Sequence, residues 1–252
     1  MNRREFLQAA VGGATLATLP ASAADAKKPF PLAGEIGITT GSFVRHLSPE
    51  ARAGKLRLLD LPKLMREELD MRVIDLMTAT LVSLEPEYCE QLRVAADRAG
   101  CVLTNLKMNN PGLELGSADE AKHRHAVAEY KRTMDAAARL GVRWVRPLPG
   151  PKRPDLARLA DGYRELMDYG AARGLGLLGE NFGWMQGDPD AIPALIKAVG
   201  PALRAQPDTG NWTDAARYDG LAKAFPLAVS CDFKAKELGA AGSHAAYALK
   251  RC

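Results

Sequence analysis

Residues 174–181 read Gly-Leu-Gly-Leu-Leu-Gly-Glu-Asn, a short apolar run that ends in a carboxylate and an amide. Nearly continuous apolar runs of this kind are typical of strands that are covered on both faces in a parallel sheet. Segments with helical periodicity lie on either side, over Asp155–Arg173 and Pro189–Val199. The stretch therefore predicts a β-α unit in which polar side chains follow the strand.

The same unit repeats along the chain. The predicted strands are Glu35–Thr40, Val73–Met77, Val102–Met108, Trp144–Leu148, Gly176–Glu180, Leu203–Gln206 and Leu227–Phe233. The predicted helices are Leu61–Leu69, Pro86–Ala99, Ala118–Leu140, Asp155–Arg173, Pro189–Val199, Thr213–Phe225 and Ser243–Cys252. Strands that alternate with helices of this length indicate β-α units and a parallel sheet.

This repeat predicts an α/β protein of the (β/α)8 TIM-barrel type. No Gly-x-Gly-x-x-Gly motif opens a helix, so a dinucleotide-binding, doubly wound sheet has no support. A barrel of this type closes with eight strands, and the sequence reaches Cys252 within its seventh predicted helix. An eighth β-α unit is missing. We expect that the chain is truncated. The alternative is a barrel that is open or closes unconventionally.

The first residues predict a removable export signal. Arg3 and Arg4 precede Glu5-Phe6-Leu7, a weakly apolar run over 8–19, and the small residues Ala21-Ser22-Ala23. This order matches a bacterial twin-arginine signal. The apolar run is about half of the roughly 20 residues that span a bilayer, so we expect no stable membrane association. The alternative is an ordinary secretory signal that carries two arginines.

The predicted organisation is a signal peptide over 1–23, a linker over 24–33 and the barrel domain over 34–252. We expect the twin-arginine export machinery to deliver the folded protein to the periplasm. The chain carries a net charge of +4, of which residues 1–23 contribute +1. Its basic residues are scattered, which argues against nucleic-acid binding. The spacing of the four cysteines predicts no zinc ribbon. A Cys89–Cys101 bridge is an alternative to simple burial of both thiols.

Three acidic residues follow consecutive predicted strands. Glu180, Asp208 and Asp232 each stand at the carboxyl end of a strand, where a barrel gathers its active site. Converging carboxylates repel each other unless a cation, a proton or a substrate ammonium group compensates them. A divalent metal is the commonest solution. Each acid taken alone is more typical of a helix cap or a solvated loop than of a metal site.

The strings that contain these acids resemble one known family. Gly179-Glu180-Asn181, Asp208-Thr209-Gly210-Asn211 and Asp232-Phe233-Lys234, in this order and spacing, resemble the xylose isomerase-like TIM barrel superfamily, the sugar phosphate isomerase/epimerase group. The resemblance extends from about Glu35 to the end of the chain. The Glu-Asn and Asp-x-Gly-Asn pair carries it, because the barrel pattern alone is not specific.

The resemblance implies a divalent metal ion held by Glu180 and Asp208, with Asp232 as a third ligand. The family has a histidine at this third position, and its fourth ligand, a glutamate on strand eight, has no counterpart in the chain. A carboxylate in place of an imidazole favours Mg²⁺ or Mn²⁺ over Zn²⁺ or Co²⁺. The same departure is expected of a metal site that has decayed.

Further residues are candidates for substrate binding. Lys107 and Asn109, with Asn110, end the third predicted strand, and Arg146 ends the fourth. The other candidates are Asn181, Trp184, Asn211 and His46. The tryptophans Trp184 and Trp212 follow the acids, so each is a candidate wall for a sugar face or a core residue. His123 and His125, two apart on a predicted helix, point to different faces and form no site.

Two functions remain open. The first is a metal-dependent isomerase or epimerase of a small polyhydroxylated carbonyl compound, in which Glu180 moves a proton and Lys234 stabilises the enediolate. The second is a non-catalytic sugar-binding or structural barrel that has lost this chemistry. A metal-dependent endonuclease is a poor third, because the chain lacks a basic groove. A homo-oligomer is compatible with either function.

Overall fold

The computed structural model of the chain describes residue 32 and residues 35–50 and 52–234. In this part of the chain, six parallel strands form one sheet in the order β1-β2-β3-β4-β5-β6. They are β1 Gly37–Thr39, β2 Val73–Met77, β3 Val102–Met108, β4 Trp144–Pro147, β5 Gly176–Gly179 and β6 Arg204–Ala205. The α/β fold with a parallel sheet of the TIM-barrel type is therefore confirmed. The predicted signal segment and the helix at Ser243–Cys252 lie outside the described residues, as does the predicted linker except for Leu32.

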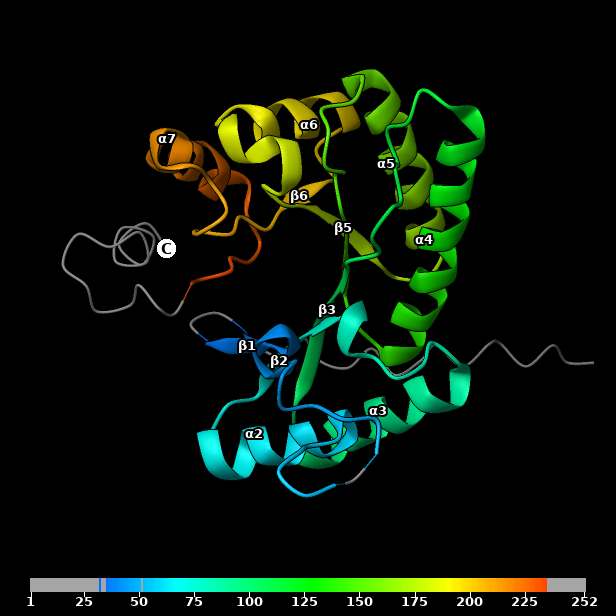
Figure 1. Cartoon of the computed structure of the whole chain (residues 1–252), viewed down its shortest axis with the longest axis vertical. Helices are drawn as coiled ribbons and strands as arrows, with labels where there is room; N and C mark the ends of the chain where they lie inside the picture. The colour runs from blue at the N-terminus through cyan, green and yellow to red at the C-terminus, as the bar shows by residue number, and fades with distance from the viewer. Residues whose placement is uncertain (1–31, 33–34, 51, 235–252) are drawn as a thin grey trace, which may run out of the picture. The chain divides into compact units, whose positions relative to one another are not determined.

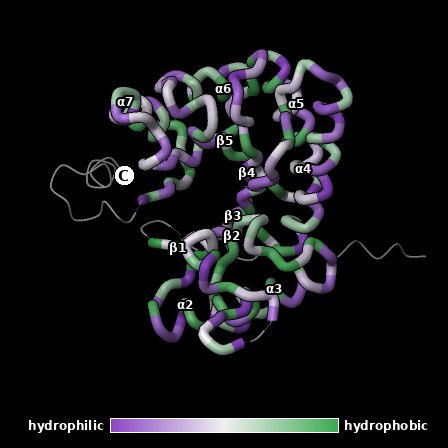
Figure 2. Tube along the Cα trace, in the orientation of Figure 1, coloured by the Kyte–Doolittle hydropathy of each residue, from purple (hydrophilic) through white to green (hydrophobic). Residues whose placement is uncertain are grey.

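Within the described residues, six α-helices connect and follow these strands. They are α2 Leu61–Leu69, α3 Pro86–Ala99, α4 Glu120–Leu140, α5 Leu156–Ala171, α6 Ala191–Val199 and α7 Asp214–Ala224. Each contacts the next, and together they follow the outside of the sheet from α2 to α7 (Figure 1). Hydrophobic and hydrophilic stretches alternate along them, as expected for helices with one face on a sheet (Figure 2).

Local sequence explains where the helices begin and end. Asp119 caps α4, because its carboxylate accepts hydrogen bonds from the backbone N–H groups of Ala121 and Lys122. Gly100 and Gly141 end α3 and α4 in the left-handed conformation, with φ of 68° and 71°. Only glycine adopts this backbone conformation without steric cost, which is why these positions were recognisable in the sequence.

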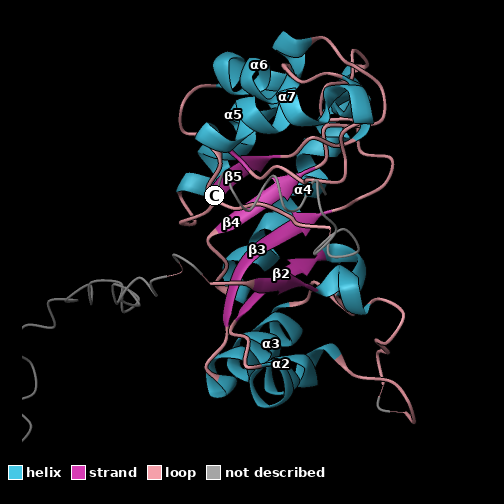
Figure 3. Ribbon diagram, turned by 90° about the vertical axis from the view of Figure 1, so that its left-hand side faces the viewer, coloured by secondary structure: helices cyan, strands magenta, loops and turns pink. Residues whose placement is uncertain are grey.

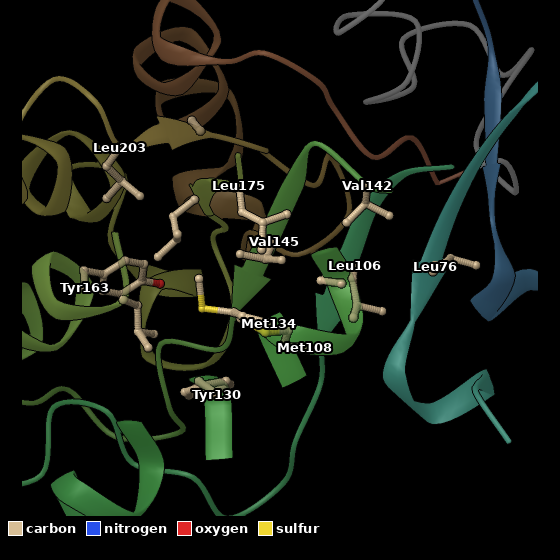
Figure 4. Packing of buried hydrophobic residues seen from close by; sticks show 14 of the residues in the cluster. Leu76, Leu106, Met108, Tyr130, Met134, Val142, Val145, Tyr163, Leu175 and Leu203 are labelled. Atoms are coloured by element: carbon tan, nitrogen blue, oxygen red, sulfur yellow. The ribbon is translucent and has the colours of Figure 1, made fainter. Parts of the chain in front are cut away.

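The hydrophobic core lies between the sheet and the helices. Figure 3 shows β2 to β5 side by side with helices stacked against them, and Figure 4 shows Met108, Tyr130, Met134 and Tyr163 within this layer. These four side chains are almost completely buried. Cys89 and Cys101 are also buried and are free thiols, so the burial of both residues is confirmed and the Cys89–Cys101 bridge is not formed.

The predicted strand Leu227–Phe233 is wrong as a continuous element. The segment makes only two isolated bridges, Ala205 with Ala228 and Asp208 with Asp232, and Leu227 belongs to the 3-10 helix Phe225–Leu227. Pro207 lies between the two bridges and has no N–H to donate to a ladder. Its carbonyl still accepts from the N–H of Asp232, at 2.9 Å. The segment therefore occupies the position of a seventh strand without regular pairing.

Polar side chains connect strands that are distant in the sheet order. Gln206, next to β6, donates from Nε2 to Oδ2 of Asp75 on β2, at 3.0 Å. Its Oε1 accepts from Nδ2 of Asn105 on β3, at 2.9 Å. A flat sheet would hold β2 and β6 far apart, so these contacts require the sheet to be curled. Among the described helices, none is long and apolar enough to cross a membrane.

Candidate active site

The three acids named from the sequence meet at one edge of the sheet. Glu180 directly follows β5, Asp208 lies beyond β6, and Asp232 lies on the bridged segment that pairs with Asp208. One ligand oxygen from each lies within 4.8 Å of the others. Glu180 and Asp208 are 3 % exposed. Three carboxylates are thus concentrated in a largely buried volume, where their repulsion must be compensated.

Lys107 compensates Asp232. Lys107 and Arg146 are register partners near the ends of β3 and β4. The ammonium Nζ of Lys107 lies 2.8 Å from Oδ1 and 2.7 Å from Oδ2 of Asp232. Its second anionic neighbour is Asp75, at 3.7 Å, and the Lys107 side chain is 3 % exposed. This lysine is held between two carboxylates.

Arg146 compensates Glu180. Its Nη1 lies 2.9 Å from Oε2 of Glu180, and the two side chains are 3 % and 4 % exposed. The approach is not aligned as a hydrogen bond, because Nε and Nη1 of Arg146 and Oε2 of Glu180 have no hydrogen-bond partner among the described residues. Oε1 of Glu180 accepts from Nδ2 of Asn211, at 3.1 Å. The pair keeps unused donors and an unused acceptor, which is costly in a buried place unless a ligand engages them.

Lys234 compensates Asp208. Its Nζ lies 2.7 Å from Oδ2 of Asp208, whose Oδ1 accepts from the N–H of Gly210 at 2.9 Å. A Cβ on Gly210 would meet the Lys234 stem at 2.2 Å, so the glycine leaves room for that stem. Asn181, which is fully buried, donates to the carbonyl of Asp208 and accepts from its N–H, at 3.0 and 2.8 Å. The Asn181 amide therefore positions Asp208.

Burial decides the direction of the pKa shift of two of the three carboxyl groups, those of Glu180 and Asp208. It raises the pKa of Glu180 above its ordinary value, although Arg146 and Lys107 oppose the shift. Burial likewise raises the pKa of Asp208 against the opposing Lys234. For Lys234, burial lowers the pKa, but the hydrogen bond and charge of Asp208 outweigh it, and the net shift is upward. A carboxyl with a raised pKa holds a proton more readily, as a general acid or base near neutral pH requires.

The other predicted residues have different surroundings. His46 is exposed in the turn after the 3-10 helix Thr40–Phe43, and none of the contacts described for the three acids involves it. Asn109 is half-buried, and its Oδ1 has no hydrogen-bond partner among the described residues. Asn110 donates to Thr133, at 3.4 Å.

The two tryptophans differ from each other. Trp184 lies in the 3-10 helix Gly183–Gly187, half-buried, with the guanidinium of Arg153 5.0 Å from its ring centroid. Trp212 is 2 % exposed, and its indole packs so closely on α7 that a Cβ at Gly220 would meet it at 2.4 Å. Trp212 is therefore a core residue.

Sequence reasoning missed Asp75, Asn105 and Gln206. Asp75 accepts from Gln206 and from Thr104, and it is the second carboxylate beside Lys107. Burial raises its pKa, with Lys107 opposing. The sequence could have indicated these residues, because they are charged or amide side chains within or next to buried strands. Such side chains need hydrogen-bond partners in the interior.

The fit of a divalent ion follows from the donor set. The three carboxylates match such an ion in donor chemistry and spacing, since they offer hard oxygen ligands within 4.8 Å. They do not match it in charge, because each already has a cationic partner: Lys107, Arg146 or Lys234. A bound dication would leave the buried Lys107 and Arg146 facing a like charge.

The fold and the site together define a class of protein: an α/β barrel with acidic and basic side chains gathered at its strand ends. The model of the xylose isomerase-like TIM barrel family matches residues 67–244. The chain therefore belongs to this family. A comparison with curated proteins finds no significant match.

Solved structures share the fold at low sequence identity. A D-psicose 3-epimerase solved with D-fructose is 17 % identical, with a TM-score of 0.66 over 85 % of this chain and 80 % of that one. A 3-keto-D-glucoside 4-epimerase from E. coli is 13 % identical, with a TM-score of 0.58 over 73 % and 77 %. A xylose isomerase domain protein from Planctomyces limnophilus is 19 % identical, with a TM-score of 0.55, and each chain covers 66 % of the other. At these identities the likeness concerns the fold alone.

Proposed function

We propose that the protein is an isomerase or epimerase that acts on a small polyhydroxylated carbonyl compound by proton transfer. The observation that carries this proposal is the buried pair of Arg146 and Glu180, which keeps free hydrogen-bonding atoms at the strand ends. A substrate hydroxyl fits this pair, because it donates to Oε2 of Glu180 and accepts from Arg146. Family membership and the epimerases among the similar structures support the same reaction class.

The reaction follows from the side chains. The Glu180 carboxylate removes a proton from the carbon next to the carbonyl, and the C–H electron pair moves into an enediolate. Arg146 and Lys234 stabilise the negative charge that develops on the oxygens. Transfer of the proton by Glu180 to the carbonyl carbon, while the proton of the adjacent hydroxyl passes to the carbonyl oxygen, isomerises the substrate. Epimerisation at the original carbon needs a proton from a second acid, such as water, on the opposite face of the enediolate.

A metal-dependent form of this chemistry would place the ion on Glu180, Asp208 and Asp232. Oxygen ligands favour Mg²⁺ or Mn²⁺ over Zn²⁺ or Co²⁺. When bound, such an ion supplies polarisation of a carbonyl and its adjacent hydroxyl. Because each carboxylate already has a protein cation, no step above passes through a metal.

Proton exchange tests the proposal without knowledge of the product. The protein is incubated in D₂O with ketoses such as D-fructose and D-tagatose, which the similar structures contain, and NMR follows deuterium entering next to the carbonyl. Replacing the base, Glu180→Gln, is expected to slow exchange by about 10²- to 10⁴-fold. The surface control Glu165→Gln, whose residue pairs with Lys131, retains full exchange. Equal exchange in the Glu180→Gln variant would refute the mechanism.

The second candidate is a non-catalytic sugar-binding barrel. The complete ion pairing of the three carboxylates favours it, because paired charges hold a structure without performing chemistry. Binding of a ketose with no exchange in the wild type decides for this candidate. We further propose that the protein acts in the periplasm after export by the twin-arginine machinery, as the sequence of residues 1–23 indicates.

A further inference from the structure

We propose that Lys107, Arg146 and Lys234 replace the divalent ion, so that the site balances its own carboxylates and holds no resident metal. The inference concerns the charge of the site and stands independently of the reaction proposed above. It rests on three ion pairs, one for each carboxylate that the family resemblance assigns to a metal.

The Asp232 pair blocks the third ligand position. Both carboxylate oxygens of Asp232 bind one ammonium group, at 2.8 and 2.7 Å. An ion on either oxygen would approach Nζ of Lys107 closely, and like charges at such short range repel strongly in a poorly solvated place. Lys107 cannot withdraw into solvent, because its side chain is 3 % exposed. The other carboxylate within 4.0 Å of its Nζ among the described residues is that of Asp75, which lies in the same cluster.

The Glu180 pair blocks the first position in the same way. Arg146 and Glu180 are 3 % and 4 % exposed. A guanidinium stays charged at any pH at which the protein is folded. A dication on Glu180 would remove the counter-charge of Arg146 while leaving that charge buried, which is strongly unfavourable.

The ion pair between Asp208 and Lys234 is the one of the three that can separate. The Lys234 side chain is 43 % exposed, whereas that of Asp208 is 4 % exposed. Lys234 can therefore swing into solvent, although its stem lies against the bare Cα of Gly210. One accessible carboxylate does not make a metal site, since ions of this kind take several oxygen ligands.

The total charge supports the inference. Within the described residues, the cluster has four carboxylates, Asp75, Glu180, Asp208 and Asp232, and three cations, Lys107, Arg146 and Lys234. Most of the negative charge is thus neutralised by the chain itself. The repulsion between converging carboxylates, which gave the reason to expect a metal, is already relieved.

Metal binding can be measured on the full-length protein without any substrate. The protein is dialysed against metal-free buffer, its metal content is determined by mass spectrometry, and free Mn²⁺ is titrated by electron paramagnetic resonance. Thermal unfolding is then followed with a chelator or with Mg²⁺, Mn²⁺, Zn²⁺ or Co²⁺. A ligand that binds only the folded state raises the midpoint. We expect substoichiometric metal and the same midpoint in every condition.

Two variants are expected to create affinity for a divalent ion. Lys107→Met frees both oxygens of Asp232 and retains a stem of similar length, so we expect its affinity for Mn²⁺ to rise at least about tenfold. Lys234→Met frees Asp208 and removes one of the three cations that repel an ion, so we expect its Mn²⁺ affinity to rise less than that of Lys107→Met, and this rise is the readout if Lys107→Met fails to fold. The matched control is Lys223→Met, because Lys223 pairs with Asp190 and Asp219 away from this cluster; it is expected to bind no more Mn²⁺ than the wild type.

The inference is overturned by either of two results. One is a wild-type protein that retains one divalent ion per chain through dialysis, with a midpoint that falls in chelator. The other is the absence of any gain in Mn²⁺ binding in both Lys107→Met and Lys234→Met. Neither readout involves turnover, so refutation of the metal-free site would leave the proposed isomerase function standing. That function is tested separately by deuterium exchange.

Discussion

Arg146 on β4 and Glu180 after β5 form a buried ion pair with 2.9 Å between Nη1 and Oε2. A buried pair loses far more when one partner is removed than when both are replaced, because the remaining charge is stranded. The two residues are therefore expected to be energetically coupled.

A double-mutant cycle measures this coupling. Arg146→Met alone is expected to lower the free energy of unfolding by about 3–5 kcal/mol. Adding Glu180→Gln restores part of the loss, with an interaction energy of about 0.5–3 kcal/mol from urea unfolding. The surface pair Arg132–Glu129 serves as the control and is expected to contribute about 0–1 kcal/mol. Strict additivity at Arg146 and Glu180 would contradict a functional ion pair.

Gly183 brings two loops of the site together. Its φ is +59°, and a Cβ there would meet the carbonyl oxygen of Gly150, in the loop after β4, at 2.1 Å. Gly183→Ala is expected to lower the free energy of unfolding by at least about 2 kcal/mol, because it adds backbone strain and a clash. Gly187 ends the same 3-10 helix and has open space around its Cβ position. Gly187→Ala should change stability by less than about 0.5 kcal/mol in the same urea experiment.

The buried hydroxyl of Tyr130 is expected to make the free energy of unfolding fall at alkaline pH. Burial raises its pKa to about 12, with the hydrogen bond from the N–H of Leu148 and the charge of Arg146 opposing. A raised pKa contributes stability that is complete below the unfolded pKa, about 10, and is lost as pH rises towards the folded value. Urea unfolding between pH 9 and 11 should show a shallower decline in Tyr130→Phe than in the wild type. Parallel declines in the two proteins would show that Tyr130 is not shifted.

Export depends on the arginine pair if the signal is of the twin-arginine type. Replacing Arg3 and Arg4 by lysine keeps the charge but removes the residues that the receptor reads. We expect the variant to stay in the cytoplasm, as does the wild type in cells without the twin-arginine translocase. Fractionation and immunoblotting measure this. An ordinary secretory signal needs only positive charge, so unchanged export would favour that alternative.

The sequence predicted the elements better than it predicted the interactions. The helix Pro86–Ala99 has the predicted ends, because Pro86 and Gly100 act locally. The helix Leu61–Leu69 also has the predicted ends, although Asp70 rather than a glycine adopts the left-handed conformation after it. The strand at Leu227–Phe233 failed because Pro207, about 20 residues earlier, interrupts the partner that it needed.

The site shows the same division between local and distant effects. The acids were recognisable because they follow strands, and strand ends meet in any parallel barrel. Their partners were not, because Lys107 and Asp232 are 125 residues apart, and no local rule pairs them. Asn181 remains a candidate for substrate contact, and its amide also binds the backbone of Asp208, a geometry that only the folded chain reveals.

The hydrogen bond from Gln206 to Asp75 also constrains the order of folding. It joins residues that are 131 positions apart, and contacts of such separation form late because the intervening loop must first be closed. A nascent chain shorter than about 206 residues holds Asp75 without this partner. We therefore expect the polar interior of the barrel to assemble after the local β-α units. Its completion joins β2, near one edge of the described sheet, to the residue that follows β6 at the other edge.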